Sequence, residues 1–326
     1  MKKVLIAILL LGLLPHASAD YIHWVDFRLS APVLRSALEL DMASQGGEQP
    51  LDWIDILALA AAWRGGTGVT VADTQRAAQA LRGDTPPERL PGMAGRYFSY
   101  YREAYGAALG GLAGHFAIRR TDPQTGEAEW IPAYGLKAFS PIAAGYFWSH
   151  YPDFGAQRSY GYVRPHLGND ILGALGTPIC AVEGGTVEAL GWNRYGGWRI
   201  GIRSDDRKRY YYYAHLRKDA PYAEGLAVGQ RVQAGDVIGF MGRTGYSAQE
   251  NVNNIETVHL HFGLQLIFDE SQKECDSEIW IDVYPIIELL ASHCSSVARD
   301  PQTGRWERLY PYCDLDAEPL RSAAAR

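Results

Sequence analysis

The chain has 326 residues, of which 47% are hydrophobic and 21% are charged, a composition typical of a globular protein with one large domain or two smaller ones. Its formal net charge is −6, from 31 Lys and Arg against 37 Asp and Glu. Without a basic excess or a long run of one charge, the sequence argues against nucleic acid as a partner.

The N-terminal residues have the pattern of a secretory signal. Lys2-Lys3 precedes an apolar run from Val4 to Leu14, and Ala17-Ser18-Ala19 offers small residues where a signal peptidase reads them. We therefore expect cleavage after Ala19, with residues 1–19 as the signal peptide. The apolar run is too short to span a bilayer, and no other segment has the character of a membrane span. The sequence predicts a protein of the periplasm, the cell wall or the surrounding medium.

Four cysteines follow, at positions 180, 275, 294 and 313. An exported protein can form disulfides, and four cysteines allow three pairings, which the sequence leaves open. Cys180 lies in an apolar run typical of a buried thiol, so Cys275, Cys294 and Cys313 are the better candidates for a bridge. Their spacing matches no zinc motif.

From residue 20 to about 115 the sequence predicts helices. Four segments carry apolar residues at helical spacing, namely 31–42, 51–64, 73–82 and 93–112. The second follows Pro50 and stops at Gly65-Gly66, which is the usual order of helix start and stop signals. Asp122-Pro123-Gln124-Thr125-Gly126 recurs as 300–304, and its turn chemistry predicts two hairpin tips.

From about Gly161 the pattern changes to short runs of strand length separated by glycines. The expected strands are 177–183, 186–192, 198–203, 210–216 and 258–268, and a helix is expected at 281–290. The predicted fold class is therefore α+β, with a helical N-terminal region followed by a mainly antiparallel β domain.

The last of these strands carries two histidines on one face. Leu260, Phe262 and Leu264 alternate with His259 and His261, so the apolar side chains and the imidazoles point to opposite sides. The two imidazoles start roughly 6.5 to 7 Å apart along the strand. One of them could bind a metal while the other moves protons.

Further candidate site residues lie upstream. His166 and Asp170 are four residues apart in a turn that enters a strand, and alternation places His215 on one face with Tyr211 and Tyr213. These features could be unrelated surface groups. Alternatively, His166, Asp170 and one further histidine would supply three ligands with an open fourth position, the pattern of catalytic zinc. The two remaining histidines would then be acid and base groups for metal-assisted hydrolysis.

In their order along the chain, these motifs resemble those of the lysostaphin/LytM-type zinc endopeptidases, which cut peptide bonds in bacterial cell-wall peptidoglycan. The shared motifs are His-x-Gly-x-Asp at 166–170, Tyr-Ala-His-Leu at 213–216, Val-x-x-Gly-x-x-Ile-Gly at 232–239, Gly-x-Thr-Gly at 242–245 and His-Leu-His-Phe at 259–262. The resemblance covers about residues 160–268. It implies a β fold of the duplicated hybrid type, with the site in a groove on the sheet.

The resemblance also implies roles for the five residues. His166, Asp170 and His261 would bind one Zn²⁺ per chain, while His215 and His259 would act on the attacking water and the scissile carbonyl. Which of these two is the general base stays open. The implied partners are the peptide stems or cross-links of peptidoglycan.

With the signal peptide, this gives a helical region of unknown role at 20–140, a LytM-like zinc peptidase domain at 141–290 and a C-terminal tail at 291–326. The helical region could dock onto the peptidase domain, bind the wall or gate the groove.

Two departures from the family pattern are present. The segment Tyr246–Val258 is longer than usual and is expected to form a wall of the groove, and Gly263 stands where the family often has Glu. Two other functions stay open. One is a non-catalytic LytM-like module that binds the wall or activates another hydrolase, although such modules typically lack a ligand. The other is a carrier or carbohydrate-binding domain with a lipoyl-type hairpin at 228–235, which lacks the lysine a carrier needs.

Overall fold

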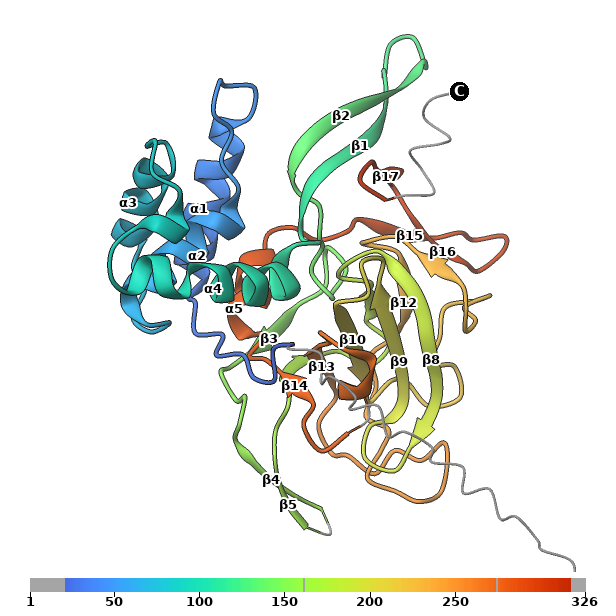
Figure 1. The fold of residues 1–326 in the computed structure, drawn as a ribbon. Helices are drawn as coiled ribbons and strands as arrows, with labels where there is room; N and C mark the ends of the chain where they lie inside the picture. The colour runs from blue at the N-terminus through green and yellow to red at the C-terminus, as the bar shows by residue number, and fades with distance from the viewer. Residues whose placement is uncertain (1–20, 161, 274, 318–326) are drawn as a thin grey trace, which may run out of the picture.

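The computed structural model describes residues 21–160, 162–273 and 275–317 (Figure 1). The predicted signal peptide and residues 318–326 lie outside the described residues. Within them, no helix combines the length and the hydrophobicity needed to cross a membrane.

The helices lie close to where the sequence predicts them. They are α1 (Ala31–Ser44), α2 (Trp53–Arg64), α3 (Val71–Leu81), α4 (Met93–Leu109) and α5 (Tyr284–Leu290), with short 3₁₀ turns η1 (Pro87–Arg89) and η2 (Glu270–Gln272). The start of α2 is set by Asp52 rather than by Pro50, because the Asp52 carboxylate accepts a hydrogen bond from the Ile54 N–H at 2.7 Å. Its end is at Gly65, whose φ of 66° is the left-handed conformation that glycine tolerates.

Both predicted hairpin tips are confirmed. The first joins β1 (Ala113–Thr121) to β2 (Ala128–Leu136), and the second joins β15 (Val297–Arg299) to β16 (Trp306–Arg308). In each, the turn aspartate accepts a backbone hydrogen bond two residues on, at 2.7 Å for Asp122 and for Asp300. A further strand, β17 (Tyr312–Asp314), pairs with β1 and so ties the C-terminal part of the chain to the first hairpin.

The β region is built on one antiparallel sheet. Its strand order is β11 (Arg231–Val232), β8 (Gly185–Asn193), β9 (Gly197–Ser204), β10 (Arg209–Ala214), β13 (His259–Leu266), β6 (Asn169–Gly173) and β3 (Trp148–His150), with β14 (Ile279–Trp280) paired to β13. Two small pairs flank it, β4 (Gln157–Tyr160) with β5 (Tyr162–Pro165), and β7 (Pro178–Cys180) with β12 (Val237–Phe240). Helices followed by antiparallel sheet confirm the predicted α+β class.

The two faces of this sheet have different roles. On one face Tyr213 lies opposite Phe262 and Tyr211 lies opposite Leu264, and all four side chains are at most 1% exposed. His261 belongs to the other face, as the alternation of β13 predicts, and it lies opposite both Ala214 and Asp170. The apolar face is therefore the core, and the second face is left for a site.

A buried cation links the helical region to the sheet, with which it shares one apolar core. Arg209, at the start of β10, is 1% exposed and donates to the carbonyl of Ala107 near the C-terminus of α4 at 2.7 Å. It also forms an ion pair with Glu183 at 2.7 Å. The last carbonyl groups of a helix lack hydrogen-bond partners within the helix. A cation placed there accepts this role as donor and also interacts favourably with the helix dipole. In Figure 1, α1 to α4 form a cluster beside the sheet.

All four cysteines are free, so the expected bridge among the C-terminal three is wrong. Cys275 follows η2, Cys294 follows α5 and Cys313 lies on β17, so each belongs to a different part of the fold. Cys180 is fully buried, as its apolar surroundings in the sequence predict.

Candidate metal centre and its groove

Three side chains bring a ligand atom to one point. Asp170 on β6 lies opposite His261 on β13, and His166 follows β5 in the loop that enters β6. Nε2 of His166 is 2.8 Å from Nδ1 of His261 and 2.9 Å from Oδ1 of Asp170, and the last two atoms are 3.1 Å apart. Ligands of one tetrahedral zinc ion would lie about 3.3 Å apart, given bonds of about 2.0 to 2.1 Å. Small adjustments would therefore let all three hold one metal ion.

The contacts of Nδ1 of His166 with Asp153 direct the other ring nitrogen, Nε2, toward the site. Nδ1 lies 3.2 Å from both the backbone carbonyl and the carboxylate of Asp153. Oxygen can only accept here, so Nδ1 carries the proton and donates it, which leaves Nε2 directed at the ligand cluster. Asp153 is itself held by Asn169 at 2.9 Å and by Arg158 at 2.7 Å. A carboxylate behind a ligating histidine is the usual support of a metal site.

The charges of this cluster suit a cation. Burial alone would raise the pKa of Asp170, but its contacts with the imidazoles of His166 and His261 hold it well below its usual value. Burial would likewise lower the pKa of His166, yet the carboxylates of Asp153 and Asp170 raise it to about 9. In the metal-free protein a protonated imidazole thus lies between two carboxylates. A metal ion would replace that positive charge.

The other two predicted histidines lie beside this cluster with a common orientation. Nδ1 of His215 is 2.9 Å from the carbonyl oxygen of Thr244, and Nδ1 of His259 is 2.9 Å from that of Thr257. Each Nδ1 must therefore donate, and Nε2 of the neutral ring is free to accept a proton. The rings are 4.7 Å apart, and Nε2 of His259 is 3.8 Å from Oδ1 of Asp170. Burial and the neighbouring histidines keep the pKa of His215 well below its usual value, so its ring is neutral.

The prediction that His215 shares a face with Tyr211 and Tyr213 is wrong. Those tyrosines point into the core, while the His215 ring lies 5.9 Å from the His261 ring on the site face. Strict alternation fails because β10 ends at Ala214 and His215 has a φ of 62°. This left-handed conformation turns the side chain back toward the site.

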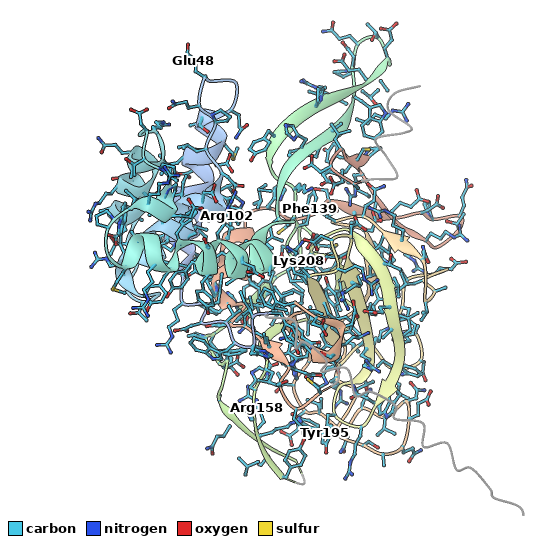
Figure 2. The ribbon with its side chains drawn as sticks, viewed as in Figure 1. Glu48, Arg102, Phe139, Arg158, Tyr195 and Lys208 are labelled. Carbon is cyan, nitrogen blue, oxygen red and sulfur yellow. The ribbon has the colours of Figure 1, made fainter. Side chains whose placement is uncertain are left out.

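The three residues of the cluster line part of a cavity of about 310 Å³. Tyr195, Tyr212, Tyr246 and Trp280 line it with aromatic surface, and Figure 2 shows Arg158 and Tyr195 near each other at one end of the molecule. Tyr246 belongs to the long segment expected to form a groove wall, and its ring lies 5.9 Å from the His215 ring.

Gly263 has a structural reason to differ from the family pattern. A Cβ atom at this position would lie 2.8 Å from the ring of Trp280, which lines the cavity. Glycine thus lets this ring pack directly on the sheet, and a larger side chain would displace it.

All five predicted site residues therefore lie together, whereas Asp153, Arg158 and Trp280 are contributions that the sequence did not reveal. Trp280 is on β14, at the far end of a loop from β13, and no spacing marks it. Asp153 gave no signal either, because its contact with His166 depends on the β4–β5 hairpin folding back. The Gly155 N–H donates to the His166 carbonyl at 2.8 Å to close that hairpin.

Comparison with known proteins matches residues 164–274 to Peptidase family M23. Over 124 residues the chain is 41% identical to the L-Ala–D-Glu endopeptidase of Bacillus subtilis, covering 38% of this chain and 36% of that protein. Over 98 residues it is 38% identical to the glycyl-glycine endopeptidase ALE-1 of Staphylococcus capitis, covering 30% of this chain and 24% of that protein. The matches thus span about a third or less of these relatives.

Among solved structures, the catalytic domain of lysostaphin from Staphylococcus simulans aligns with 44% of this chain and 92% of its own, at 29% identity and a TM-score of 0.33.

Proposed function

Since residues 164–274 form a Peptidase family M23 domain, homologous to lysostaphin and the L-Ala–D-Glu endopeptidase, we propose that this chain is an exported, zinc-dependent endopeptidase of bacterial peptidoglycan. It hydrolyses peptide bonds in the stems or cross-links of the wall. The observation that carries the proposal is the meeting of His166, Asp170, His261 and His215 in one groove, with His259 beside His215 and Asp170.

The donor set agrees with zinc. Two imidazole nitrogens and one carboxylate oxygen are ligands that Zn²⁺ takes in catalytic sites, where three protein ligands leave a position open. When bound, Zn²⁺ supplies a Lewis acid that polarises the scissile carbonyl and acidifies the attacking water. Asp153 holds Nε2 of His166 in the ligand cluster, and Arg158 binds Oδ2 of Asp170 at 3.1 Å, which leaves Oδ1 for the metal.

His215 and His259 carry the proton transfers in this proposal. Their Nε2 atoms are acceptors in the neutral rings, because both Nδ1 atoms donate to carbonyl oxygens. One imidazole takes a proton from the attacking water as its oxygen bonds to the carbonyl carbon. The imidazolium then donates a proton to the leaving amine as the carbon–nitrogen bond breaks, so the enzyme returns to its first state.

In this proposal residues 1–19 are a signal peptide and 141–290 are the peptidase domain. Residues 20–140 are an N-terminal region that holds α1 to α4 and the β1–β2 hairpin, and 291–326 are the C-terminal part, which holds β15 to β17. The relatives are named for L-Ala–D-Glu, glycyl-glycine and DD-endopeptidase activities, and the bond that this chain cleaves is one that the proposal leaves open.

A digestion of whole peptidoglycan tests the proposal. The purified chain without residues 1–19 is analysed for metal and then incubated with peptidoglycan, with and without a chelator. We expect one zinc per chain and release of peptide fragments that the chelator stops. Zinc binding without any release would favour the alternative, a non-catalytic module that binds the wall or activates another hydrolase. A chain that takes up no zinc would refute the metal-dependent mechanism.

A further inference from the structure

The groove is richer in cations than in carboxylates. Four basic side chains line it, at positions 158, 164, 199 and 273, against the two carboxylates Asp170 and Glu278. Two of the cations are already engaged, since Arg158 binds Asp153 and Asp170, and Lys273 binds Glu188 at 2.8 Å. Asp170 in turn belongs to the metal cluster. This leaves Arg164 and Arg199 as the cations to be explained.

Among the described residues, no carboxylate oxygen lies within 4.0 Å of a guanidinium nitrogen of either arginine, so neither forms an ion pair there. Nε of Arg199 is buried and has no hydrogen-bond partner there. Buried donors in folded proteins are nearly always paired. The Arg199 guanidinium therefore keeps hydrogen-bonding capacity that the described residues do not use, and its side chain lines the cavity that a ligand would enter. Arg164 stacks over the ring of Tyr195, with its guanidinium carbon 4.4 Å from the ring centroid. Stacking holds the guanidinium plane in place while its N–H groups project from the edge.

Both arginines line the cavity that also contains the metal cluster. Arg199 is two residues from Gly201 on β9, and Gly201 lies opposite Tyr212 on β10, so all three belong to the site face of the sheet. The ring of Tyr212 lies 5.9 Å from that of His261. Arg164 is two residues from His166 and lines the same cavity as Arg199 and Tyr212.

We propose that Arg164 and Arg199 bind a carboxylate of the substrate, so that the groove selects an acidic peptide with a free carboxylate beside the scissile bond. A guanidinium presents two parallel donors that match a carboxylate, and the pairing is strongest away from water. An uncharged glycine bridge would leave both arginines unpaired. This inference rests on the proposed function, and it assigns the substrate to the acidic class.

Binding to an inactive chain tests the inference without requiring turnover. The zinc-loaded His259→Ala chain is titrated by calorimetry with the peptide L-Ala–D-Glu–L-Lys and with the same peptide carrying a carboxamide in place of the free glutamyl carboxylate. We expect the carboxylate peptide to bind about 10- to 100-fold more tightly, as a charge-assisted pair supplies. In the same background, Arg199→Gln should abolish this preference.

Two further variants complete the design. Arg164→Gln should reduce the preference and serves as the second variant if Arg199→Gln does not fold. Arg119→Gln makes the same chemical change at an exposed position of β1, outside the groove, and should leave the preference intact.

Equal binding of the two peptides, or no binding of either, would overturn the inference. So would a preference that survives both groove variants. In each of these cases, chelator-sensitive release from peptidoglycan would still uphold the proposed function, so the two failures are distinguishable.

Discussion

Nε2 of His166 lies 2.8 Å from Nδ1 of His261, although 95 positions separate the two residues in the chain. Two bare lone pairs repel one another at this distance, so a proton or a metal ion must lie between them. In the metal-free protein the proton belongs to His166, whose pKa is raised to about 9 by Asp153 and Asp170, against the effect of burial. In the proposed enzyme, the same geometry would receive the metal ion.

Replacing one member of this pair should remove the metal. We expect His261→Ala to reduce zinc from one per chain to almost none after dialysis, because only two ligands remain and catalytic zinc takes three from the protein. Metal analysis of the purified variant measures this. His115→Ala is a matched control on exposed β1 and should keep its zinc. A His261→Ala chain with full zinc would show that this residue is not a ligand.

Removing either of the two histidines proposed to transfer protons should lower the rate of hydrolysis without loss of zinc. His259→Ala and His215→Ala should keep zinc, because neither residue belongs to the three-ligand cluster. Each should lower the rate of peptidoglycan hydrolysis by about 10²- to 10⁴-fold, the usual contribution of general acid–base catalysis. The rate and the metal content are measured on the same preparation. Undiminished hydrolysis by either variant would remove that histidine from the mechanism.

Asp153 should control metal affinity without touching the metal. Asp153→Asn keeps the shape of the side chain but loses the charge that holds His166 by its Nδ1–H. We expect zinc affinity to fall about 10- to 100-fold, as for other carboxylates behind metal ligands. Competition with a chromophoric chelator measures the affinity. Asp122→Asn, in an exposed turn, is the control and should not change it.

Much of the site could be predicted from the sequence because its residues lie in regular strands. The alternation of β13 correctly separates His259 and His261 from the buried Leu260 and Phe262. A strand fixes the direction of each side chain with a period of two, so the pattern carries that information locally. The same rule failed for His215, because alternation holds only inside a strand. His215 follows the end of β10 in a left-handed conformation, which turns its side chain to the other face of the sheet.

Contacts between distant segments could not be predicted in this way. Arg209 looks like an ordinary charge at the start of a strand, yet it is buried against Glu183 and against α4, whose Ala107 lies 102 positions earlier. Its burial depends on where the helical region docks, and no local period encodes that. The support of His166 by Asp153 likewise follows from the closing of the β4–β5 hairpin.

The docking cation should be important for stability. Arg209→Met removes one partner of a buried ion pair and leaves Glu183 uncompensated, which costs about 3 to 5 kcal/mol in the free energy of unfolding. Urea unfolding followed by fluorescence measures the change. The double variant Arg209→Met/Glu183→Leu should recover a large part of the loss, because it removes the stranded charge. A double variant that is no more stable than the single would mean that the hydrogen bonds to α4 dominate instead.

The metal-free protein should lose stability as the pH rises from about 6.5 to about 9. His166 has a folded pKa of about 9 against an unfolded value near 6.5, so the folded state binds its proton more tightly. The resulting stabilisation is complete below about pH 6.5 and is lost as the pH rises through about 9, and it is on the order of 3 kcal/mol at most. His215 acts in the opposite direction below pH 6.5, because burial lowers its folded pKa and its protonation favours unfolding.

Urea unfolding of chelator-treated protein at pH 6.5, 7.5 and 9 measures this prediction. His166→Gln cannot take up the proton, so its stability should change less across the same range. Saturating zinc should also suppress the loss in the wild-type chain, because the metal then holds the two carboxylates in place of the imidazolium. A metal-free wild-type chain that is equally stable at pH 6.5 and pH 9 would show that His166 is not protonated between Asp153 and Asp170.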